Sequence, residues 1–199
     1  FEMPLRVLGR EMLLASTVAK TSNNMAAVCG STPNAMHIRF VLEDSTVQLR
    51  TVASTMTANL ENERMKQVMK QGYGDPILFG YKVLAYTPDS SAVVFDVTSL
   101  FHTDIAQLSP LAKMTGRYDV QGHMKPAQSR LGEIKAFDDN VSIRSTLLYT
   151  VNVWYSIIPV LRQVAVTLEA NRTLMLLPEE KMHPRLSDSR VGTFLTDKR

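Results

Sequence analysis

The stretch VSIRSTLLYTVNVWYSII, from Val141 to Ile158, decides the fold class. Apolar side chains recur at every second position over most of its length, which is the period of a half-buried β-strand. The residues that keep this period are Ile143, Leu147, Tyr149, Val151, Val153 and Tyr155. Because the stretch is also rich in Val, Ile, Thr and Tyr, it predicts one long strand in a pleated sheet.

The segments that follow this stretch have the same character. Leu161 to Leu168 and Thr173 to Leu177 are expected to be β segments that pair with it. We interpret the polar residues Glu169-Ala170-Asn171-Arg172 as the turn between them. At the other end of the chain, Val7 to Ala19 is expected to form a strand pair or one long bent strand, with a break at Gly9.

Two hairpins are predicted between these regions. Met36 to Leu42 alternates, and Val47 to Val52 returns with the same period after a polar turn. Phe79 to Tyr86 and Ala92 to Val97 flank a turn that contains Pro88 and Asp89. The polar turns that join these segments favour antiparallel pairing.

The remaining segments predict little regular structure. Asn59 to Gln71 has an apolar stripe at helical spacing and a capping Asn, and Thr103 to Leu108 is expected to be a second, short helix. Residues 21–34 are expected to form a loop, and residues 112–129 a long irregular surface loop. We therefore predict a mainly β fold (α+β) with antiparallel sheets, sandwich-like, with one or two short helices, in a single domain over residues 1–199.

Composition excludes several classes of protein. The chain has 199 residues, of which 45% are hydrophobic and 21% charged, so it is expected to fold as a globular domain rather than to be disordered. The net charge of +3 is scattered, without the basic face or interleaved aromatics of a nucleic-acid binder. No apolar run reaches the length of about 18 residues that a transmembrane helix needs. Cys29 is the one cysteine, which excludes an intramolecular disulfide.

No catalytic motif is visible in the chain. It lacks a His-Glu-x-x-His helix, a phosphate-binding glycine loop, a nucleophile elbow and a dinucleotide fingerprint. Two stretches contain a histidine that has a simple structural interpretation. His102-Thr103-Asp104 is interpreted as a helix start, and His37 as a solvated side chain on the polar face of a strand. We therefore expect this chain to hold no catalytic residue, cofactor or metal.

The end of the chain, residues 178–199, is a polar strip that we interpret as a domain boundary. Together with three earlier stretches it resembles an uncharacterised N-terminal domain of large zinc-dependent metalloproteases of Bacteroidetes and related bacteria. The resemblance is carried by Leu177-Pro178-Glu179, Met182, Pro184-Arg185, Asp188, Arg190-Val191-Gly192 and Phe194, by Leu8 to Leu14 with Val18 to Thr21, by Ser91 to Thr98 with Phe101, and by Leu108-Ser109-Pro110.

The resemblance implies a non-catalytic accessory domain that packs on or orients a following metzincin-like catalytic domain, which would hold the zinc. It implies a periplasmic, outer-membrane-anchored or secreted protein, and is consistent with a chain that begins without Met. Pro184, Arg185, Asp188 and Arg190 are the expected domain-interface residues, since arginine–carboxylate pairs suit a fixed domain seam. A sharper hypothesis places Asp188 at the open coordination position of that zinc in a latent form.

Other functions remain open from the sequence. The domain could present a strand edge between Val141 and Leu177 to a peptide substrate. A different class is a free-standing β-sandwich of the cell envelope that binds glycan or protein through an aromatic platform of Trp154, Tyr155, Tyr149 and Tyr86. Because Trp154 lies within an apolar strand, we expect it to be a core residue instead. A third hypothesis is an enzyme with a site built from His102, Asp104 and His183.

Overall fold

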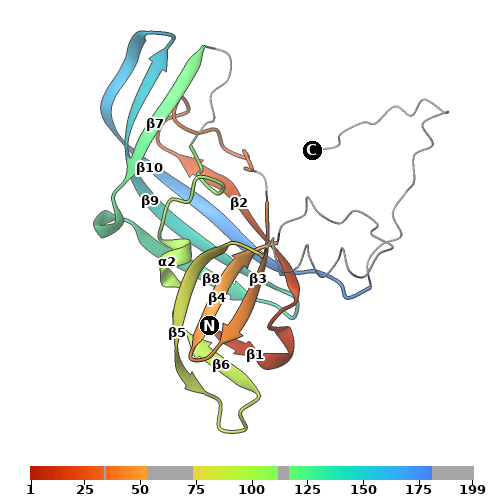
Figure 1. Cartoon of the computed structure of the whole chain (residues 1–199). Coiled ribbons are helices and arrows are strands. Elements are labelled where there is room, and N and C mark those ends of the chain that lie inside the picture. The colour runs from red at the N-terminus through yellow and green to blue at the C-terminus, as the bar shows by residue number, and fades with distance from the viewer. Residues whose placement is uncertain (34, 53–73, 112–116, 181–199) are drawn as a thin grey trace, which may run out of the picture.

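The computed structural model describes residues 1–33, 35–52, 74–111 and 117–180. Their strands form one antiparallel, curled sheet in the order β1-β6-β5-β4-β3-β2-β10-β9-β7, with β8 also paired to β9 (Figure 1). The prediction of a mainly β, antiparallel fold with very little helix is confirmed. The strands are β1 (Glu2–Pro4), β2 (Glu11–Thr21), β3 (Met36–Glu43), β4 (Thr46–Thr51), β5 (Ile77–Tyr86), β6 (Ala92–Phe95), β7 (Tyr118–Met124), β8 (Arg130–Ala136), β9 (Asn140–Tyr155) and β10 (Ile158–Leu176).

The β9–β10 hairpin contains the two longest strands of the sheet. Strand β9 follows the predicted alternation and buries every second side chain. The turn predicted at Glu169 to Arg172 is wrong, because β10 continues through these residues and pairs with β2 on one side and β9 on the other. The chain reverses instead at Ser156 and Ile157. Pairing on both edges satisfies the backbone of the polar segment and overrides its turn composition.

The predicted hairpins are confirmed as β3–β4 and β5–β6. The predicted break at Gly9 is also confirmed, since the φ angle of Gly9 is +80° between the 3-10 turn Leu5–Val7 and β2. A positive φ angle is one that glycine adopts without the steric cost a Cβ atom brings. Strand β2 then runs as one strand of 11 residues.

Two sequence-based expectations are corrected elsewhere. The short helix lies at α2 (Thr98–Phe101) rather than at 103–108, because the Asp96 side chain accepts the Thr98 N–H and starts the turn earlier. The irregular loop expected at 112–129 contains strand β7 and the 3-10 turn Pro126–Gln128. Strand β7 is polar, and its partner β9 supplies the pairing that its own sequence does not announce. The helix predicted at Asn59 to Gln71 lies outside the described residues.

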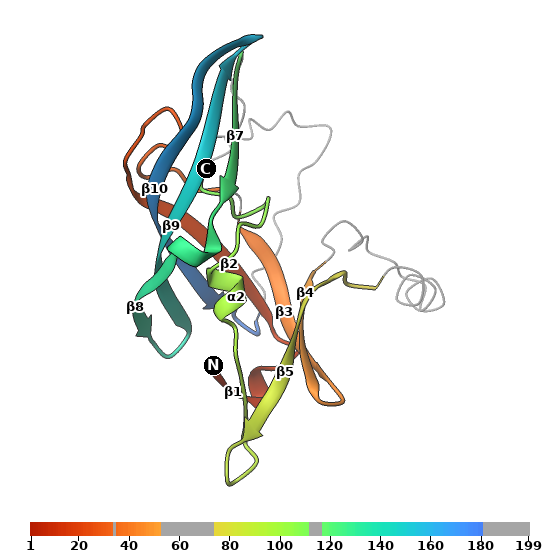
Figure 2. The same ribbon diagram turned by 90° about the vertical axis from the view of Figure 1, so that its left-hand side faces the viewer.

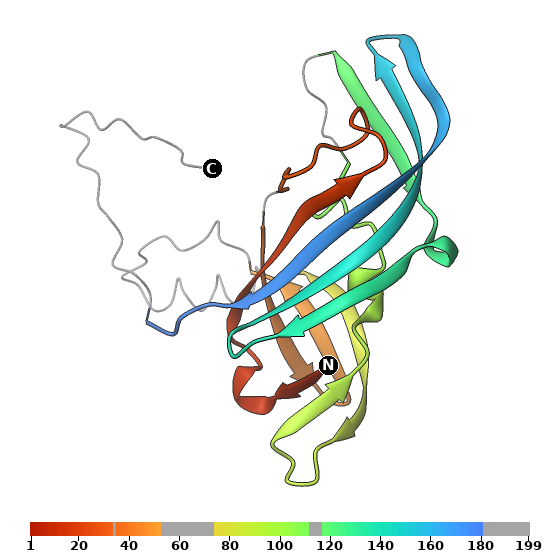
Figure 3. The same cartoon turned by 180° about the vertical axis from the view of Figure 1, so that it is seen from behind.

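The apolar core consists of two clusters. The larger one joins β1, β3–β6 and α2 to the lower ends of β2, β9 and β10, with Phe40, Phe95 and Phe101 at its centre. The second lies toward the far end of the β9–β10 hairpin and includes Leu147 and Val166. Figures 2 and 3 show this hairpin and β7 rising to one end of the molecule, with the β5–β6 turn at the opposite end.

Candidate functional site

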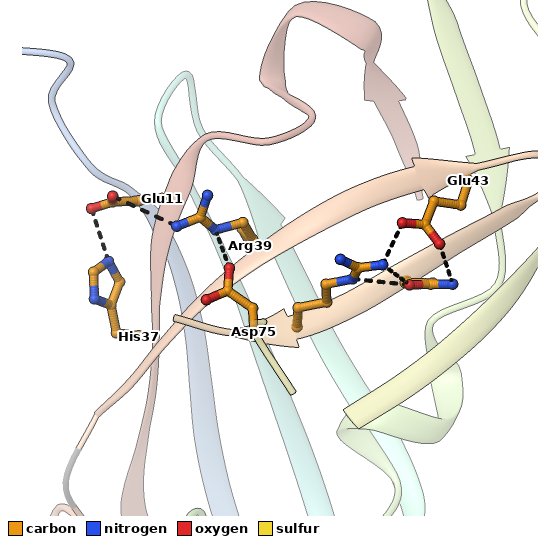
Figure 4. A network of polar contacts seen from close by, with 7 residues as sticks. Glu11, His37, Arg39, Glu43 and Asp75 are labelled. Atoms are coloured by element: carbon orange, nitrogen blue, oxygen red, sulfur yellow. Dashed lines mark hydrogen bonds and ion pairs between the residues drawn. The ribbon is translucent and has the colours of Figure 1, made fainter. Parts of the chain in front are cut away.

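A strip of charged and polar side chains lies on the outer face of β2, β3 and β4 (Figure 4). It forms because the inward positions of these strands carry the core, so that alternate positions point outward. On β3 the outward residues are His37 and Arg39, each about one-quarter exposed. We call the set Glu11, His37, Arg39, Asp75, Glu43, Gln48 and Arg50 the outer polar strip.

Two connected groups make up the outer polar strip. In the first, His37 Nε2 lies 3.1 Å from Glu11 Oε2, and Arg39 Nε lies 3.0 Å from Asp75 Oδ2. Arg39 Nη2 also lies 3.9 Å from Glu11 Oε1, which joins the two pairs.

In the second group, the Arg50 guanidinium binds both Glu43 and Gln48. Its Nε donates to Gln48 Oε1 at 2.9 Å. Gln48 and Arg50 lie two positions apart on one face of β4, and the β3–β4 register brings Glu43 beside them.

The end of the described chain is fixed beside this strip. Arg10 Nη2 donates to the Leu177 carbonyl at 2.9 Å, and Arg10 Nη1 lies 3.2 Å from Glu179 Oε1. Arg10 immediately precedes Glu11, the first residue of the strip. The polypeptide that continues beyond Glu180 therefore starts at the edge of the outer polar strip.

A cavity of about 420 Å³ lies on the opposite side of the same part of the sheet. Met12 points into it from β2, whereas Glu11 points outward. The remaining apolar lining comes from the first residues of the chain, the β8–β9 turn and the end of β10, and Phe137 at that turn is 59% exposed. The size is within the range of small-ligand pockets, and its lining suits an apolar group.

A buried polar layer separates the two core clusters. Arg172 on β10 is fully buried, and it pairs in register with buried Ser16 on β2. Its Nη1 donates to the Leu100 carbonyl at 2.9 Å, and Ser145 Oγ donates to the Phe101 carbonyl at 2.9 Å. Both bonds satisfy carbonyls at the end of α2, where a helix leaves such groups without partners.

Asp104 is the carboxylate of this layer. Burial raises the pKa of Asp104 above its usual value, against hydrogen bonding from Tyr149 and Ser109 and the charge of Arg172. Burial likewise raises the pKa of Tyr149 and lowers that of Arg172. The layer is enclosed by core residues, so we interpret it as structural rather than catalytic.

The sequence-predicted sites are placed as follows. Pro184, Arg185, Asp188 and Arg190 lie outside the described residues, as does His183. His102 Nε2 lies 2.7 Å from the Ser129 carbonyl, and Cys29 is exposed. Within the described ranges, which omit 34, 53–73, 112–116 and 181–199, no group of three His, Cys, Asp or Glu side chains is placed to hold a metal. In the same ranges no helix is long and apolar enough to cross a membrane.

The hypothetical aromatic platform is not assembled. Tyr149 is fully buried, and Tyr86 lies on the β5–β6 hairpin at the opposite end of the molecule from Trp154 and Tyr155 (Figure 3). Trp154 is half-buried with Arg162 stacked over its ring at 5.9 Å. These four side chains therefore do not form one surface.

The strand edge between Val141 and Leu177 is largely occupied. Strand β9 is paired on both sides, and β2 pairs with β10 only from Leu168 onward. The free edge at the start of β10 contains Pro159 and two register shifts, and Gln163 has a φ angle of 51°. Proline and bulges are features that block the addition of another strand.

Sequence reasoning missed the outer polar strip and the Arg10 contact. The alternation at His37 and Arg39 indicated a polar face, but the partners of these residues come from other strands and from Asp75.

A model of one protein family, described as a domain of unknown function (DUF5117), matches residues 30–199. No curated protein and no solved structure matches the chain.

Proposed function

The chain belongs to the DUF5117 family, and we propose that it is a non-catalytic accessory domain that binds a neighbouring domain of the same polypeptide through its outer polar strip. The observation that carries the proposal is the Arg10 contact with Leu177 and Glu179. One guanidinium fixes the outgoing chain to the strand that begins the strip. The described chain therefore ends next to Glu11, on the side of the molecule where the proposed neighbour would bind.

The chemistry of the strip supports a role in contact rather than in stability. Its ion pairs are partly exposed, and such pairs contribute only about 0–1 kcal/mol to folding. Interfaces between domains of one chain are more polar than permanent interfaces, so charged pairs of this kind suit them. Covering the strip would remove water from Arg39 and Glu11 and strengthen their pairing with the partner.

We further propose that the neighbour is the metzincin-like zinc peptidase domain that the resemblance in the sequence implies. On this proposal the zinc and the peptide chemistry belong to that domain, and the protein works in the periplasm, at the outer membrane or outside the cell. The cavity behind Met12 could receive an apolar side chain of the same neighbour, because it opens close to the end of β10. The predicted interface residues Pro184 to Arg190 lie outside the described residues. The test below therefore uses a residue of the outer polar strip.

The proposal is tested by expressing this chain and the segment that follows it in the parent polypeptide as separate proteins. Isothermal titration calorimetry should show binding that Arg39→Glu weakens about tenfold or more, because the substitution removes the cation that pairs with Glu11 and Asp75 and adds a further carboxylate to this part of the strip. Lys125→Glu is the matched control, an exposed cation between β7 and the 3-10 turn Pro126–Gln128, away from the strip.

Two results would contradict the proposal. One is binding that Arg39→Glu leaves unchanged or that Lys125→Glu weakens equally. The other is a purified chain that retains stoichiometric zinc after dialysis, or that cleaves peptides unaided, since either property would place the chemistry here.

A further inference from the structure

The end of the β9–β10 hairpin differs from the other hairpin ends of the described chain. The turns of β3–β4, β5–β6 and β8–β9 contain Asp44, Asp89 and Asp138 respectively. The β9–β10 end instead exposes Ile157 and Ile158, at 87% and 60%, followed by Val160. Residues 155–160 carry no charge at all. We call the described residues 117–119 and 154–162 the hairpin tip.

Side chains of the hairpin tip are ordered by type along its length. Ile157 lies at the turn itself. Tyr118 and Tyr155 follow directly behind it, with ring centroids 4.9 Å apart. Trp154 comes next, one strand position behind Tyr155 and opposite Pro159, and Arg162 stacks on the Trp154 ring.

The charges of the hairpin tip are predominantly positive. The Arg117 carbonyl accepts the Ser156 N–H at 2.6 Å, so Arg117 lies beside the turn, whereas Arg162 lies behind it. Arg117 and Arg162 are exposed cations, and Asp119 is the one carboxylate in the hairpin tip. The Asp119 carboxylate accepts a hydrogen bond from Gln121 at 2.8 Å, rather than from Arg117 or Arg162. Two cations thus flank an apolar end that points away from the rest of the sheet (Figures 1 and 3).

We propose that the hairpin tip inserts into the interfacial region of an anionic lipid bilayer. Isoleucine reaches the acyl boundary, tyrosine and tryptophan lie at headgroup depth, and the arginines contact the lipid phosphates. The tip thus combines the groups that the interface of a bilayer accommodates, namely apolar side chains in the acyl region, aromatic rings at the headgroups and cations near the lipid phosphates.

A protein partner explains the same surface less well. A hydrophobic pocket in a partner could take Ile157 and Ile158, and aromatic and arginine side chains are common at such contacts. It would not require an uncharged apolar turn to be followed by aromatic rings and flanked by cations from two segments of the chain. The inference concerns a region remote from the outer polar strip, so it does not depend on the proposed domain contact.

The chain contains a single tryptophan, and it lies in the hairpin tip. Trp154 emission should therefore shift to the blue when the protein is mixed with phosphatidylcholine vesicles that contain phosphatidylglycerol, and the protein should co-sediment with them. Ile157→Asp should weaken vesicle binding about tenfold or more, because it removes an aliphatic side chain that the bilayer would bury and adds a charge. Arg162→Gln should weaken binding to anionic vesicles about fivefold and leave binding to pure phosphatidylcholine unchanged.

Leu84→Asp is the matched control, since Leu84 is a 65% exposed aliphatic residue on β5 at the other end of the molecule. It should leave vesicle binding unchanged. The proposal is overturned if wild-type Trp154 emission does not respond to anionic vesicles, or if Ile157→Asp and Leu84→Asp weaken binding equally. It is also overturned if Ile157→Asp abolishes self-association in sedimentation velocity while vesicle binding is absent, because the occupant is then a second copy of the chain.

Discussion

The two ends of the β9–β10 hairpin break the usual rule of burial in opposite directions. Near its open end, opposite Ile143, the hairpin buries the charged Arg172, and at its turn it exposes the apolar Ile157. Arg172 Nη1 donates to the Leu100 carbonyl, whereas its Nε and Nη2 have no hydrogen-bond partner among the described residues. Ile157 is 87% exposed, so no described residue covers it. The comparison teaches that the buried cation is held by contacts within the chain, although incompletely, whereas the exposed isoleucine is left for a partner outside the chain.

The largest expected effect on stability comes from substitution of the buried Arg172. Arg172→Ala should lower the free energy of unfolding by about 3–5 kcal/mol, because it removes one partner of a buried polar arrangement. It also leaves the Leu100 carbonyl without its donor. Urea denaturation followed by circular dichroism measures the change. A loss below about 1 kcal/mol would show that the polar layer does not hold the two clusters together.

Leu147 tests the core next to that layer. It is fully buried on β9 in the second cluster. Leu147→Ala should cost about 2–5 kcal/mol, through lost burial and the cavity that remains. The same denaturation experiment measures it, with Leu148→Ala as a half-buried neighbour on the opposite face. If the two substitutions cost the same, the assignment of β9 faces is wrong.

Asp104 gives the comparison a pH dependence. Burial raises its pKa in the folded state above the unfolded value, so the protonated form stabilises the fold. This contribution is fully present below the unfolded pKa and is lost as pH rises through the folded pKa. The difference in unfolding free energy between wild type and Asp104→Asn should therefore shift in favour of the variant as pH rises. A difference that is flat, or that shifts the other way, contradicts the account.

The smallest effect is expected at the exposed end. Ile157→Asp should change the free energy of unfolding by no more than about 0.5 kcal/mol, because the side chain makes no core contact. Thermal denaturation of the variant beside Arg172→Ala shows the contrast directly. A large loss of stability at Ile157 would mean that the tip is part of the fold and not a surface for an external partner.

The alternating strands could be predicted from the sequence because period-2 patterning records which face is buried. Strands β3, β4, β5, β6 and β9 all follow from it. The polar segment Glu169 to Arg172 does not form the predicted turn because its partners are distant in the sequence, among them the Leu100 carbonyl at the end of α2. Strand β7 could not be predicted because its partner β9 is also distant in the sequence, and only that pairing makes it a strand.

The candidate site was less predictable than the fold. The alternation of His37 and Arg39 indicated a polar face, but the contacts of Arg10 with Leu177 and Glu179 join positions far apart in the sequence. Cross-strand partners depend on register, and register depends on the whole sheet. The hairpin tip left a local signal, since Ser156 and Ile157 replace the Asn, Asp or Gly that a two-residue turn favours.

The central claim is that the outer polar strip is covered by a neighbouring domain. Carbodiimide labelling of carboxylates, measured by mass spectrometry, tests it most directly in the isolated chain and in the longer parent polypeptide. The account predicts that Glu43 and Glu179, whose side chains are 50% and 77% exposed here, are labelled less in the parent, while Asp89 on the β5–β6 turn is labelled equally in both. Equal labelling of all three carboxylates would contradict it.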